Sequence, residues 1–195
     1  YKADLGILER RGLLYPCFCT RADIAAAASA PQGPEGPVYP GTCRGLPASE
    51  RADRIAAGTP YALRLDMAKA LARTGELSFR DESRGRIACD PARFGDVVLA
   101  RKDVPGSYHL CVTHDDAAQG VTLVTRGEDL LPATDIHRVL QALMRWPEPG
   151  YAHHPLLTDA EGKRLAKRDK AATLRALREA GVAPAEARAM AGFPD

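Results

Sequence analysis

The sequence predicts an α/β fold, and three observations lead to this prediction. Segments with the strand-like alternation of apolar and polar residues, such as 61–66, recur along the chain. Segments with the 3.6-residue spacing of helices, such as 134–146, alternate with them. The chain has 195 residues, of which 45% are hydrophobic and 27% are charged, so it is long enough and apolar enough to bury a core.

The N-terminal third predicts helices separated by a loop rich in proline and glycine. Helices are expected over residues 1–12, 21–30 and 49–58. The hydroxyl of Thr20 can accept a hydrogen bond from a free amide in the first turn of the second helix. Ser49 and Gly58 fit the start and the stop of the third helix. Residues 31–41, PQGPEGPVYPG, are expected to form the loop between the second and third helices.

The rest of the chain predicts mainly strands, followed by helices. Residues 77–90 are expected to form a strand, a turn and a second strand. Residues 96–116 and 120–131 are expected to form β-strands with a charged loop between them. A helix is expected over 134–146, and the block 161–181 predicts a basic loop that leads into a helix.

Composition and charge exclude several classes of protein. The net charge of +2 excludes a uniformly basic nucleic-acid coat but allows a local basic patch. No apolar run approaches the roughly 20 residues that cross a bilayer, and no signal-peptide pattern opens the chain, so a cytoplasmic protein is expected. Five cysteines fit a disulfide scaffold poorly, and Cys89 and Cys111, in apolar strand-like contexts, are expected to be buried and inert. The chain begins YKADLGILERRG, inside an apparent helix and without methionine, so we expect a fragment of a longer protein.

The stretch YPCFCTR places Cys17 and Cys19 one residue apart. A disulfide between them would be strained, whereas a turn can direct both thiolates at one zinc ion. Downstream, YPGTC adds Tyr39 and Cys43, which gives two pairs of residues separated by a loop, as in small zinc knuckles. The alternative is that three buried thiols and a packed tyrosine fill a small core. Spacing alone leaves both interpretations open.

A basic segment, GKRLAKRDK, precedes the last predicted helix. Its basic residues are Lys163, Arg164, Lys167, Arg168 and Lys170. Such a loop could neutralise a polyphosphate during attack on its α-phosphate, or it could be ordinary solvated surface.

Arg126 follows the alternating segment GVTLVT and precedes a turn. It should therefore lie at the carboxyl end of a strand, where α/β sheets present ligand-binding groups. Its guanidinium could bind a substrate carboxylate through two hydrogen bonds, and Tyr108 could donate its hydroxyl to the same ligand. The alternative is an ordinary ion pair of Arg126 with Glu128 or Asp129.

Six segments together carry a family resemblance. They are YPCFCT, YPGTCR, FGDVVLARKDVPGSYHL, THDDAAQGVTLVTRGEDLLPATDIHRVLQAL, RWPEPGYAHHPLL and GKRLAKRD. Their order and separations resemble those of class I glutamyl-tRNA synthetases over nearly the whole chain, and more closely those of a truncated paralogous group. The resemblance implies the second half of a Rossmann-like nucleotide-binding fold with a zinc-binding α+β insertion and a short helical C-terminus. The implied parts are the end of the first Rossmann half at 1–14, the insertion at 15–90, the second Rossmann half at 91–157, and a loop with C-terminal helices at 158–195.

The resemblance also assigns roles to individual residues. The implied zinc ligands are Cys17, Cys19, Tyr39 and Cys43. Tyr108 and Arg126 would bind the glutamate substrate. Lys167 matches the second lysine of the class I KMSKS signature and would be the catalytic, ATP-binding residue, with Mg²⁺ accompanying ATP. Arg164 and Ala166 replace the first lysine and the serine of that signature, and His153 and Leu156 match a segment that borders the adenine pocket.

The implied reaction has two steps. A glutamate carboxylate attacks the α-phosphorus of ATP, and the glutamyl group then passes to tRNA. In the paralogous group the acceptor is the queuosine base of tRNA(Asp), and in the true synthetases it is the terminal ribose of tRNA(Glu). Only 27 residues follow the RLAKR segment, Asp169 to Asp195, which favours the paralogous group because an anticodon-binding domain does not fit in that length. A monomer is expected.

Three alternatives remain open. The chain could be a fragment of a true glutamyl-tRNA synthetase, a non-catalytic zinc-containing RNA-binding module, or a structural fragment without activity. The family's HIGH-type signature, which binds ATP and belongs to the first Rossmann half, does not occur in this sequence. The fragment alone is therefore expected to be inactive.

Overall fold

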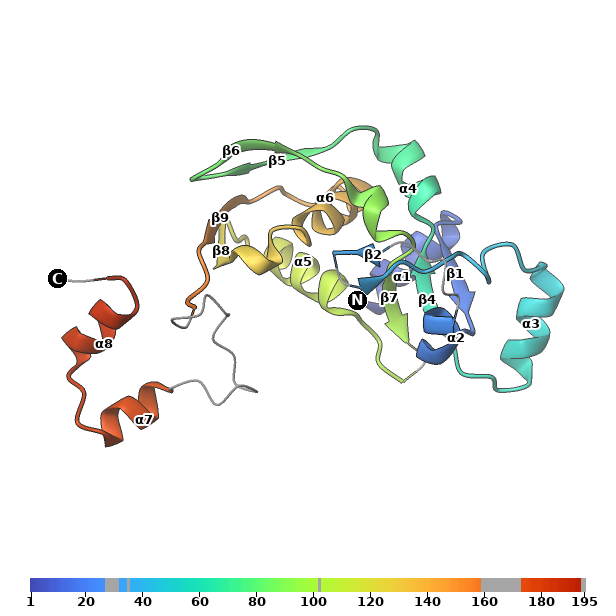
Figure 1. Cartoon of the computed structure of the whole chain (residues 1–195). Helices are drawn as coiled ribbons and strands as arrows, with labels where there is room; N and C mark the ends of the chain where they lie inside the picture. The colour runs from blue at the N-terminus through green and yellow to red at the C-terminus, as the bar shows by residue number, and fades with distance from the viewer. Residues whose placement is uncertain (27–31, 35, 102, 159–172, 194–195) are drawn as a thin grey trace. The chain divides into compact units, whose positions relative to one another are not determined.

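The computed structural model describes residues 1–26, 32–34, 36–101, 103–158 and 173–193 (Figure 1). The chain divides into two units. The first comprises Tyr1–Arg126 and Leu130–His153, and the second comprises Gly127–Asp129 and His154–Asp195. The basic segment that contains Arg164, Ala166 and Lys167 lies outside the described residues.

A three-stranded antiparallel sheet in the order β1-β4-β7 forms one part of the first unit. Its strands are β1 (Leu14–Cys17), β4 (Ala62–Leu65) and β7 (Val98–Arg101). The helix α1 (Lys2–Arg10) contacts β1. The core beside this sheet is aliphatic, and its fully buried members include Leu8, Leu13, Leu65, Leu99, Leu110, Ile136, Val139 and Leu140. Each such side chain contributes about 1.5–3 kcal/mol of hydrophobic stabilisation, so this core anchors the first unit.

A second sheet, in the order β6-β5-β9-β8, carries the strand ends that matter for function. Its strands are β5 (Ser78–Asp81), β6 (Gly85–Ala88), β8 (Leu123–Gly127) and β9 (Gly150–His154). β5 and β9 run parallel, with Asp81 opposite Tyr151. Tyr151 and His153 are two residues apart on β9, so both point to the same face of the sheet, where both are buried.

Two helices cover this region. α5 (Tyr108–Ala118) packs against α6 (Thr134–Met144), and α6 also packs on β5 (Figure 1). The hydroxyl of Ser107 caps α5 by accepting a hydrogen bond from the amide of Leu110 at 3.4 Å. α6 is buried along nearly its whole length. The polar residues of α6, such as Thr134 and His137, therefore lie in the interior and need hydrogen-bond partners there.

The segment between β1 and β4 contains α2 (Arg21–Ala26), the two-residue strands β2 (Gln32–Gly33) and β3 (Gly36–Pro37), and α3 (Ala48–Ala56). α4 (Met67–Thr74) follows β4, and the 3₁₀ helix η1 (Pro91–Phe94) precedes β7. Tyr39 is tied to the rest of the unit by a parallel bridge to Gly95. Gly95 has φ +61°, and a Cβ atom there would lie 2.6 Å from the side chain of Val38, so a side chain at this position would displace Val38, the neighbour of Tyr39.

The structure confirms strands within 61–66, 77–90 and 120–131 and the helix within 134–146. The predicted strand over 108–116 is wrong, because Ser107 caps a helix there. α3 begins at Ala48 after Pro47, without the predicted Ser49 cap, and α4, capped by Asp66, was not predicted. The expected loop at 31–41 contains the β2–β3 pair. Two thiols expected to be buried, Cys89 and Cys111, are each partly exposed.

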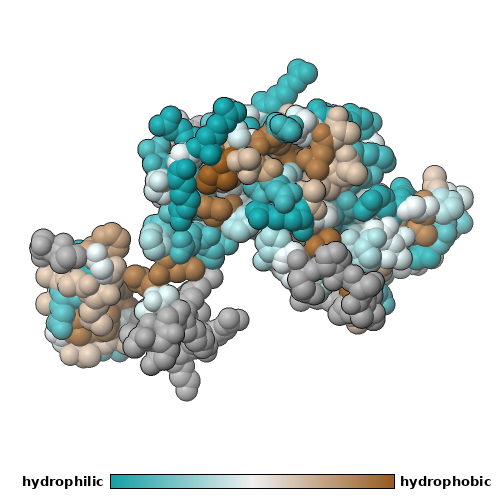
Figure 2. Space-filling model, turned by 45° about the horizontal axis from the view of Figure 1, so that its top comes forward, coloured by the Kyte–Doolittle hydropathy of each residue, from teal (hydrophilic) through white to brown (hydrophobic). Residues whose placement is uncertain are grey.

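The described part of the second unit ends in two short helices, α7 (Leu174–Glu179) and α8 (Pro184–Met190). The hydroxyl of Thr173 caps α7 by accepting from the amide of Ala176 at 3.1 Å. Leu174 and Met190 are largely exposed, and Figure 2 shows hydrophobic residues on the surface of this helix pair. Among the described residues, no helix combines the length and the apolar character needed to cross a membrane.

Leu99→Ala is expected to lower the free energy of unfolding by about 2–5 kcal/mol, because Leu99 is fully buried in the middle of β7 and its truncation leaves a cavity. Leu123→Ala, on β8, is the matched control, because Leu123 is 46% exposed and should change stability by less than about 0.5 kcal/mol. Urea denaturation measures both. Equal losses for the two variants would contradict the assigned core.

Candidate active site and metal centre

Three cysteines from two separate segments meet at one point. Cys17 ends β1, Cys19 follows two residues later, and Cys43 comes from the loop before α3. Their Sγ atoms all lie within 4.8 Å of one another, and those of Cys19 and Cys43 are 3.6 Å apart. The hydroxyl oxygen of Tyr39 lies 3.9 Å from the Sγ of Cys19. The structure therefore brings the four predicted ligand residues together.

The donor set fits a tetrahedral metal ion. With metal–sulfur bonds of about 2.3 Å, two thiolates on one zinc ion lie about 3.8 Å apart, close to the Cys19–Cys43 separation. Cys17 and Cys43 are buried, and Cys19 is partly buried, so all three thiols are shielded from most solvent. The three thiols offer the soft ligands that such an ion prefers, and the phenol of Tyr39 is an unusual fourth ligand. The cluster can hold a metal ion.

The electrostatics of the cluster differ from one thiol to the next. Burial, with added repulsion from the neighbouring thiols, raises the pKa of Cys19 to about 11. Burial also opposes the thiolate of Cys43, but hydrogen bonds from the Phe18 amide and from Tyr39 hold the pKa of Cys43 below its ordinary value. A bound cation would favour all three thiolates, since metal binding displaces thiol protons.

The surroundings fix the ligand residues in place. The guanidinium of Arg64 lies 3.9 Å from the centre of the Tyr39 ring, in a cation–π contact. The amide of Cys43 donates to the Tyr39 hydroxyl at 2.7 Å. The buried carboxylate of Asp96 accepts from Arg44 Nε at 2.7 Å and from the Met67 amide at 3.0 Å, and the Tyr15 hydroxyl also donates to it. The cluster is thus joined to the core by charged contacts.

Arg126 is held by three neutral partners. Its Nε donates to His153 Nε2 at 3.0 Å, and its two terminal nitrogens donate to His137 Nδ1 at 3.3 Å and to the Thr134 hydroxyl at 2.6 Å. The guanidinium also lies 5.4 Å from the centre of the Tyr151 ring. Within the described residues, these bonds use three of the five N–H donors of an arginine and leave one on each terminal nitrogen. That remaining pair suits a carboxylate.

Tyr108 lies beside the same histidine. It is the first residue of α5, and its side chain is half exposed. Its ring centre is 5.8 Å from that of His137 and 5.6 Å from that of His109. Arg126 also contacts His137, so the two residues predicted to share a ligand have this imidazole as a common neighbour.

His137 supports this arrangement as a neutral ring. Burial, the positive charge of Arg126 and the neighbouring imidazoles hold the pKa of His137 well below its ordinary value. Because arginine can only donate, Nδ1 of His137 must accept, and its Nε2–H is then directed at Nδ1 of His109, 3.3 Å away. The interior polar residues of α6 are satisfied in this way.

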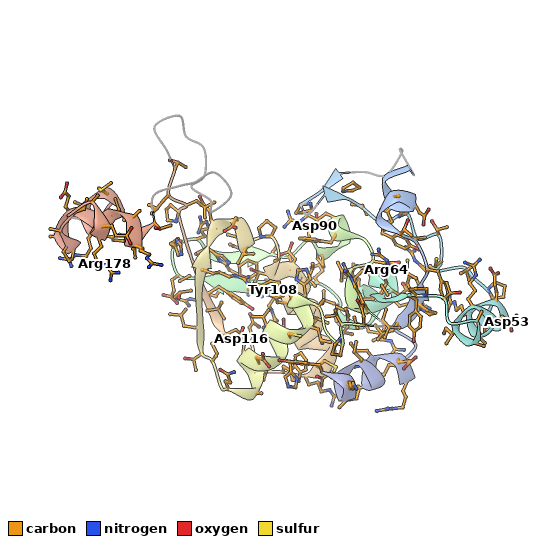
Figure 3. The ribbon with its side chains drawn as sticks, turned by 90° about the horizontal axis from the view of Figure 1, so that it is seen from below. Asp53, Arg64, Asp90, Tyr108, Asp116 and Arg178 are labelled. Carbon is orange, nitrogen blue, oxygen red and sulfur yellow. The ribbon has the colours of Figure 1, made fainter. Side chains whose placement is uncertain are left out.

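A cavity of about 430 Å³ opens next to Tyr108. Its polar and aromatic lining includes Tyr39, Arg64, Asp96, Ser107, Tyr108 and His109. Figure 3 shows Tyr108 and Asp116 on α5 and Arg64 on the neighbouring part of the first unit. The cavity is therefore lined both by Tyr39 of the candidate metal cluster and by Tyr108, which is predicted to bind substrate.

Several residues of this site were not predicted. Asp81, Thr134 and His137 received no role from the sequence, and His153 was matched only to an adenine-bordering segment. Three of the five histidines of the chain, His109, His137 and His153, gather near Arg126. Their separation in the sequence hides this arrangement, and the only local signal is the polar spacing TDIH at the start of an otherwise apolar helix.

Comparison with known proteins agrees with this geometry. Residues 1–190 match the family model of the class I tRNA synthetases (E and Q), catalytic domain. The glutamyl-Q tRNA(Asp) synthetase of Rhodobacter capsulatus is 48% identical, over 99% of this chain and 72% of that protein. The chain belongs to the glutamyl-Q tRNA(Asp) synthetase family. Proteins of the same name from Nocardia farcinica and Symbiobacterium thermophilum are 45% and 43% identical, and the chain spans 58% and 56% of their lengths.

Solved structures place this glutamyl-Q tRNA(Asp) synthetase family member in the predicted fold class. The glutamate-tRNA synthetase of Elizabethkingia anophelis superimposes with a TM-score of 0.63 and 27% identity, over 84% of this chain and 36% of that one. A glutamate tRNA ligase of Elizabethkingia meningosepticum, in complex with its amino acid, gives 0.63 and 26%, over 86% and 36%. The prediction of a class I synthetase α/β fold and of a ligase-type enzyme is thus confirmed.

Proposed function

We propose that the complete protein to which this chain belongs activates L-glutamate with ATP and transfers the glutamyl group to the queuosine base of tRNA(Asp). The names of the most similar relatives support this reaction. The observation that carries the proposal is Arg126, whose guanidinium is fixed by three neutral partners and keeps two N–H donors available. Tyr108 lies against His137, one of these partners. An arginine in that state matches an anionic amino-acid side chain.

Arg126 would hold the carboxylate that does not react. The reacting carboxylate has to attack the α-phosphorus of ATP, and two hydrogen bonds from a guanidinium would withdraw its electron density and weaken it as a nucleophile. The two carboxylates of glutamate divide these tasks between them, one as anchor and one as nucleophile. Tyr108 would add a hydroxyl donor to the anchored group. The site then prefers glutamate to glutamine, because in a two-point contact the amide NH₂ of glutamine would face one of the guanidinium N–H donors.

The remaining groups follow from the family. Lys167, with Mg²⁺, would neutralise the charge that develops on the triphosphate as the adenylate forms and pyrophosphate leaves. Zinc would be held by Cys17, Cys19, Tyr39 and Cys43, and with four protein ligands its contribution would be structural. The proposed parts remain the end of a first Rossmann half at 1–14, the insertion at 15–90, the second half at 91–157 and the loop with C-terminal helices at 158–195. We propose a cytoplasmic monomer.

Pyrophosphate exchange into ATP tests the proposal on the complete protein. Exchange should require L-glutamate, should proceed without tRNA, and should remain at background with glutamine. Transfer of labelled glutamate should then depend on tRNA(Asp) that carries queuosine and should be absent with the unmodified tRNA. Charging of tRNA(Glu) instead would favour a true glutamyl-tRNA synthetase, and RNA binding without any exchange would favour a non-catalytic module. Either outcome would reject the proposal.

A further inference from the structure

A buried carboxylate–imidazole pair lies behind Arg126. Asp81 ends β5 and is fully buried, and His153 on β9 is 4% exposed. The Oδ2 atom of Asp81 lies 2.7 Å from His153 Nδ1 and also accepts from the His153 amide at 3.1 Å. The ring plane of His153 is fixed by Tyr151, whose ring is stacked at 6.0 Å with an interplanar angle of 10°. The imidazole therefore has one orientation, toward Arg126.

The hydrogen bonds define which nitrogen of His153 carries the proton. Arg126 has donors only, so His153 Nε2 must be an acceptor. The proton of the neutral ring then sits on Nδ1 and points at Asp81, which is an acceptor as long as it is ionised. Burial opposes that ionisation, but hydrogen bonds from His153 and Ser83 hold the pKa of Asp81 well below its ordinary value. In the hydrogen-bonded series Arg126–His153–Asp81, each N–H donor therefore meets an acceptor.

We propose that Asp81 and His153 are positioning residues that hold the Arg126 guanidinium in the orientation needed for the substrate carboxylate. This inference rests on the proposed function, because it takes Arg126 as the carboxylate anchor. Both side chains are fully shielded from solvent, so the pair acts through Arg126. A bidentate contact tolerates little rotation of the guanidinium, so loss of the Nε acceptor should weaken glutamate binding while ATP binding is unaffected.

Asp81→Asn is the most informative change because it conserves shape. The other oxygen of Asp81, Oδ1, accepts from the Ser83 amide at 3.0 Å, the Ser83 hydroxyl at 2.8 Å and the Arg84 amide at 3.1 Å. These donors would hold the asparagine oxygen at that position and turn its NH₂ group toward His153. The imidazole would then have to accept on Nδ1 and carry its proton on Nε2. The Nε2–H of His153 would point at the Nε–H of Arg126, so two donors would face each other.

The test uses ATP–pyrophosphate exchange by the complete protein, with glutamate and ATP varied separately. Asp81→Asn and His153→Leu should raise the KM for glutamate roughly 10- to 100-fold and leave the KM for ATP within about twofold. His153→Gln, which keeps an acceptor near the Nε2 position, should recover part of that loss. Ser83→Ala is the control, because it loosens the same turn without changing the face of Asp81 that contacts His153, and it should retain the wild-type KM for glutamate.

His153→Gln keeps a polar side chain of similar reach, so it remains informative if the leucine variant does not fold. Two outcomes would overturn the inference and leave Asp81 a purely structural role. One is that the variants of Asp81 and His153 raise the KM for ATP as much as the KM for glutamate. The other is that Asp81→Asn and Ser83→Ala have the same KM for glutamate. A wild-type protein without glutamate-dependent exchange would reject the proposed function, and the inference with it. An active wild type with an unchanged Asp81→Asn variant would reject the inference alone.

Discussion

Arg126→Lys is expected to lower kcat/KM for glutamate in the complete protein by roughly 100- to 1,000-fold. A lysine carries the same charge, but it cannot donate to His153, His137 and Thr134 at once and still present two parallel N–H groups to a carboxylate. A 100- to 1,000-fold loss corresponds to about 2.7–4.1 kcal/mol. This lies within the about 2–5 kcal/mol that removal of one partner from a desolvated charged contact costs. Exchange kinetics at varied glutamate concentration measure the loss.

The matched control for this change is Arg86→Lys. Arg86 is an exposed arginine on β6, in the same sheet, and its Nε donates to Ser78 Oγ at 2.9 Å. Its replacement should leave both KM values near those of the wild type. If Arg126→Lys retained the wild-type KM for glutamate, Arg126 would not be the carboxylate anchor. If both variants lost activity equally, the loss would reflect the stability of the sheet.

Local signals predicted some elements of this fold well. The strands β5 and β6, the turn between them and the helix α6 were predicted correctly. In each of these elements the apolar residues recur with the period of the element itself. α5 was misread as a strand. Its first half, YHLCVT, contains Tyr108, Val112 and Thr113, which are residue types favoured in strands. The helix depends on the Ser107 cap and on packing against α6. The signal that could have identified it is the Pro-Gly-Ser sequence before Tyr108.

Some residues of the candidate site could be predicted from neighbouring residues in the sequence, and others are brought together only by the fold. Cys17 and Cys19 are neighbours in the sequence, and the downstream segment YPGTC adds Tyr39 and Cys43, so the candidate metal cluster was visible from spacing. The family resemblance then assigned all four residues as zinc ligands. The contact of His153 with Asp81 joins residues 72 positions apart and exists only because β5 and β9 pair in parallel. No periodicity within either strand encodes that pairing. The candidate ligand-binding residues were therefore predictable, and the residues that contact and orient them were not.

Cys17→Ser is expected to reduce the zinc content of the purified complete protein from about one ion per chain to a small fraction, and to lower the free energy of unfolding by about 4 kcal/mol or more. Serine keeps the size of the side chain but is a much poorer zinc ligand than a thiolate. Cys17 is almost fully buried at the end of β1, so a neighbouring ligand cannot easily take its place. Elemental analysis and thermal denaturation, each with and without a chelator, measure the two effects.

Cys89→Ser is the control for general effects of losing a thiol, because Cys89 is also partly shielded and is not a member of the cluster. It should keep the wild-type zinc content and a stability within about 1 kcal/mol of the wild type. A chelator should lower the melting temperature of the wild type and of Cys89→Ser but have little further effect on Cys17→Ser, since that variant has no zinc left to lose. The contrary result would be wild-type protein that contains no zinc after purification and does not gain stability when zinc is added. In that case the three thiols and Tyr39 form only a small core, which is the alternative that their spacing left open.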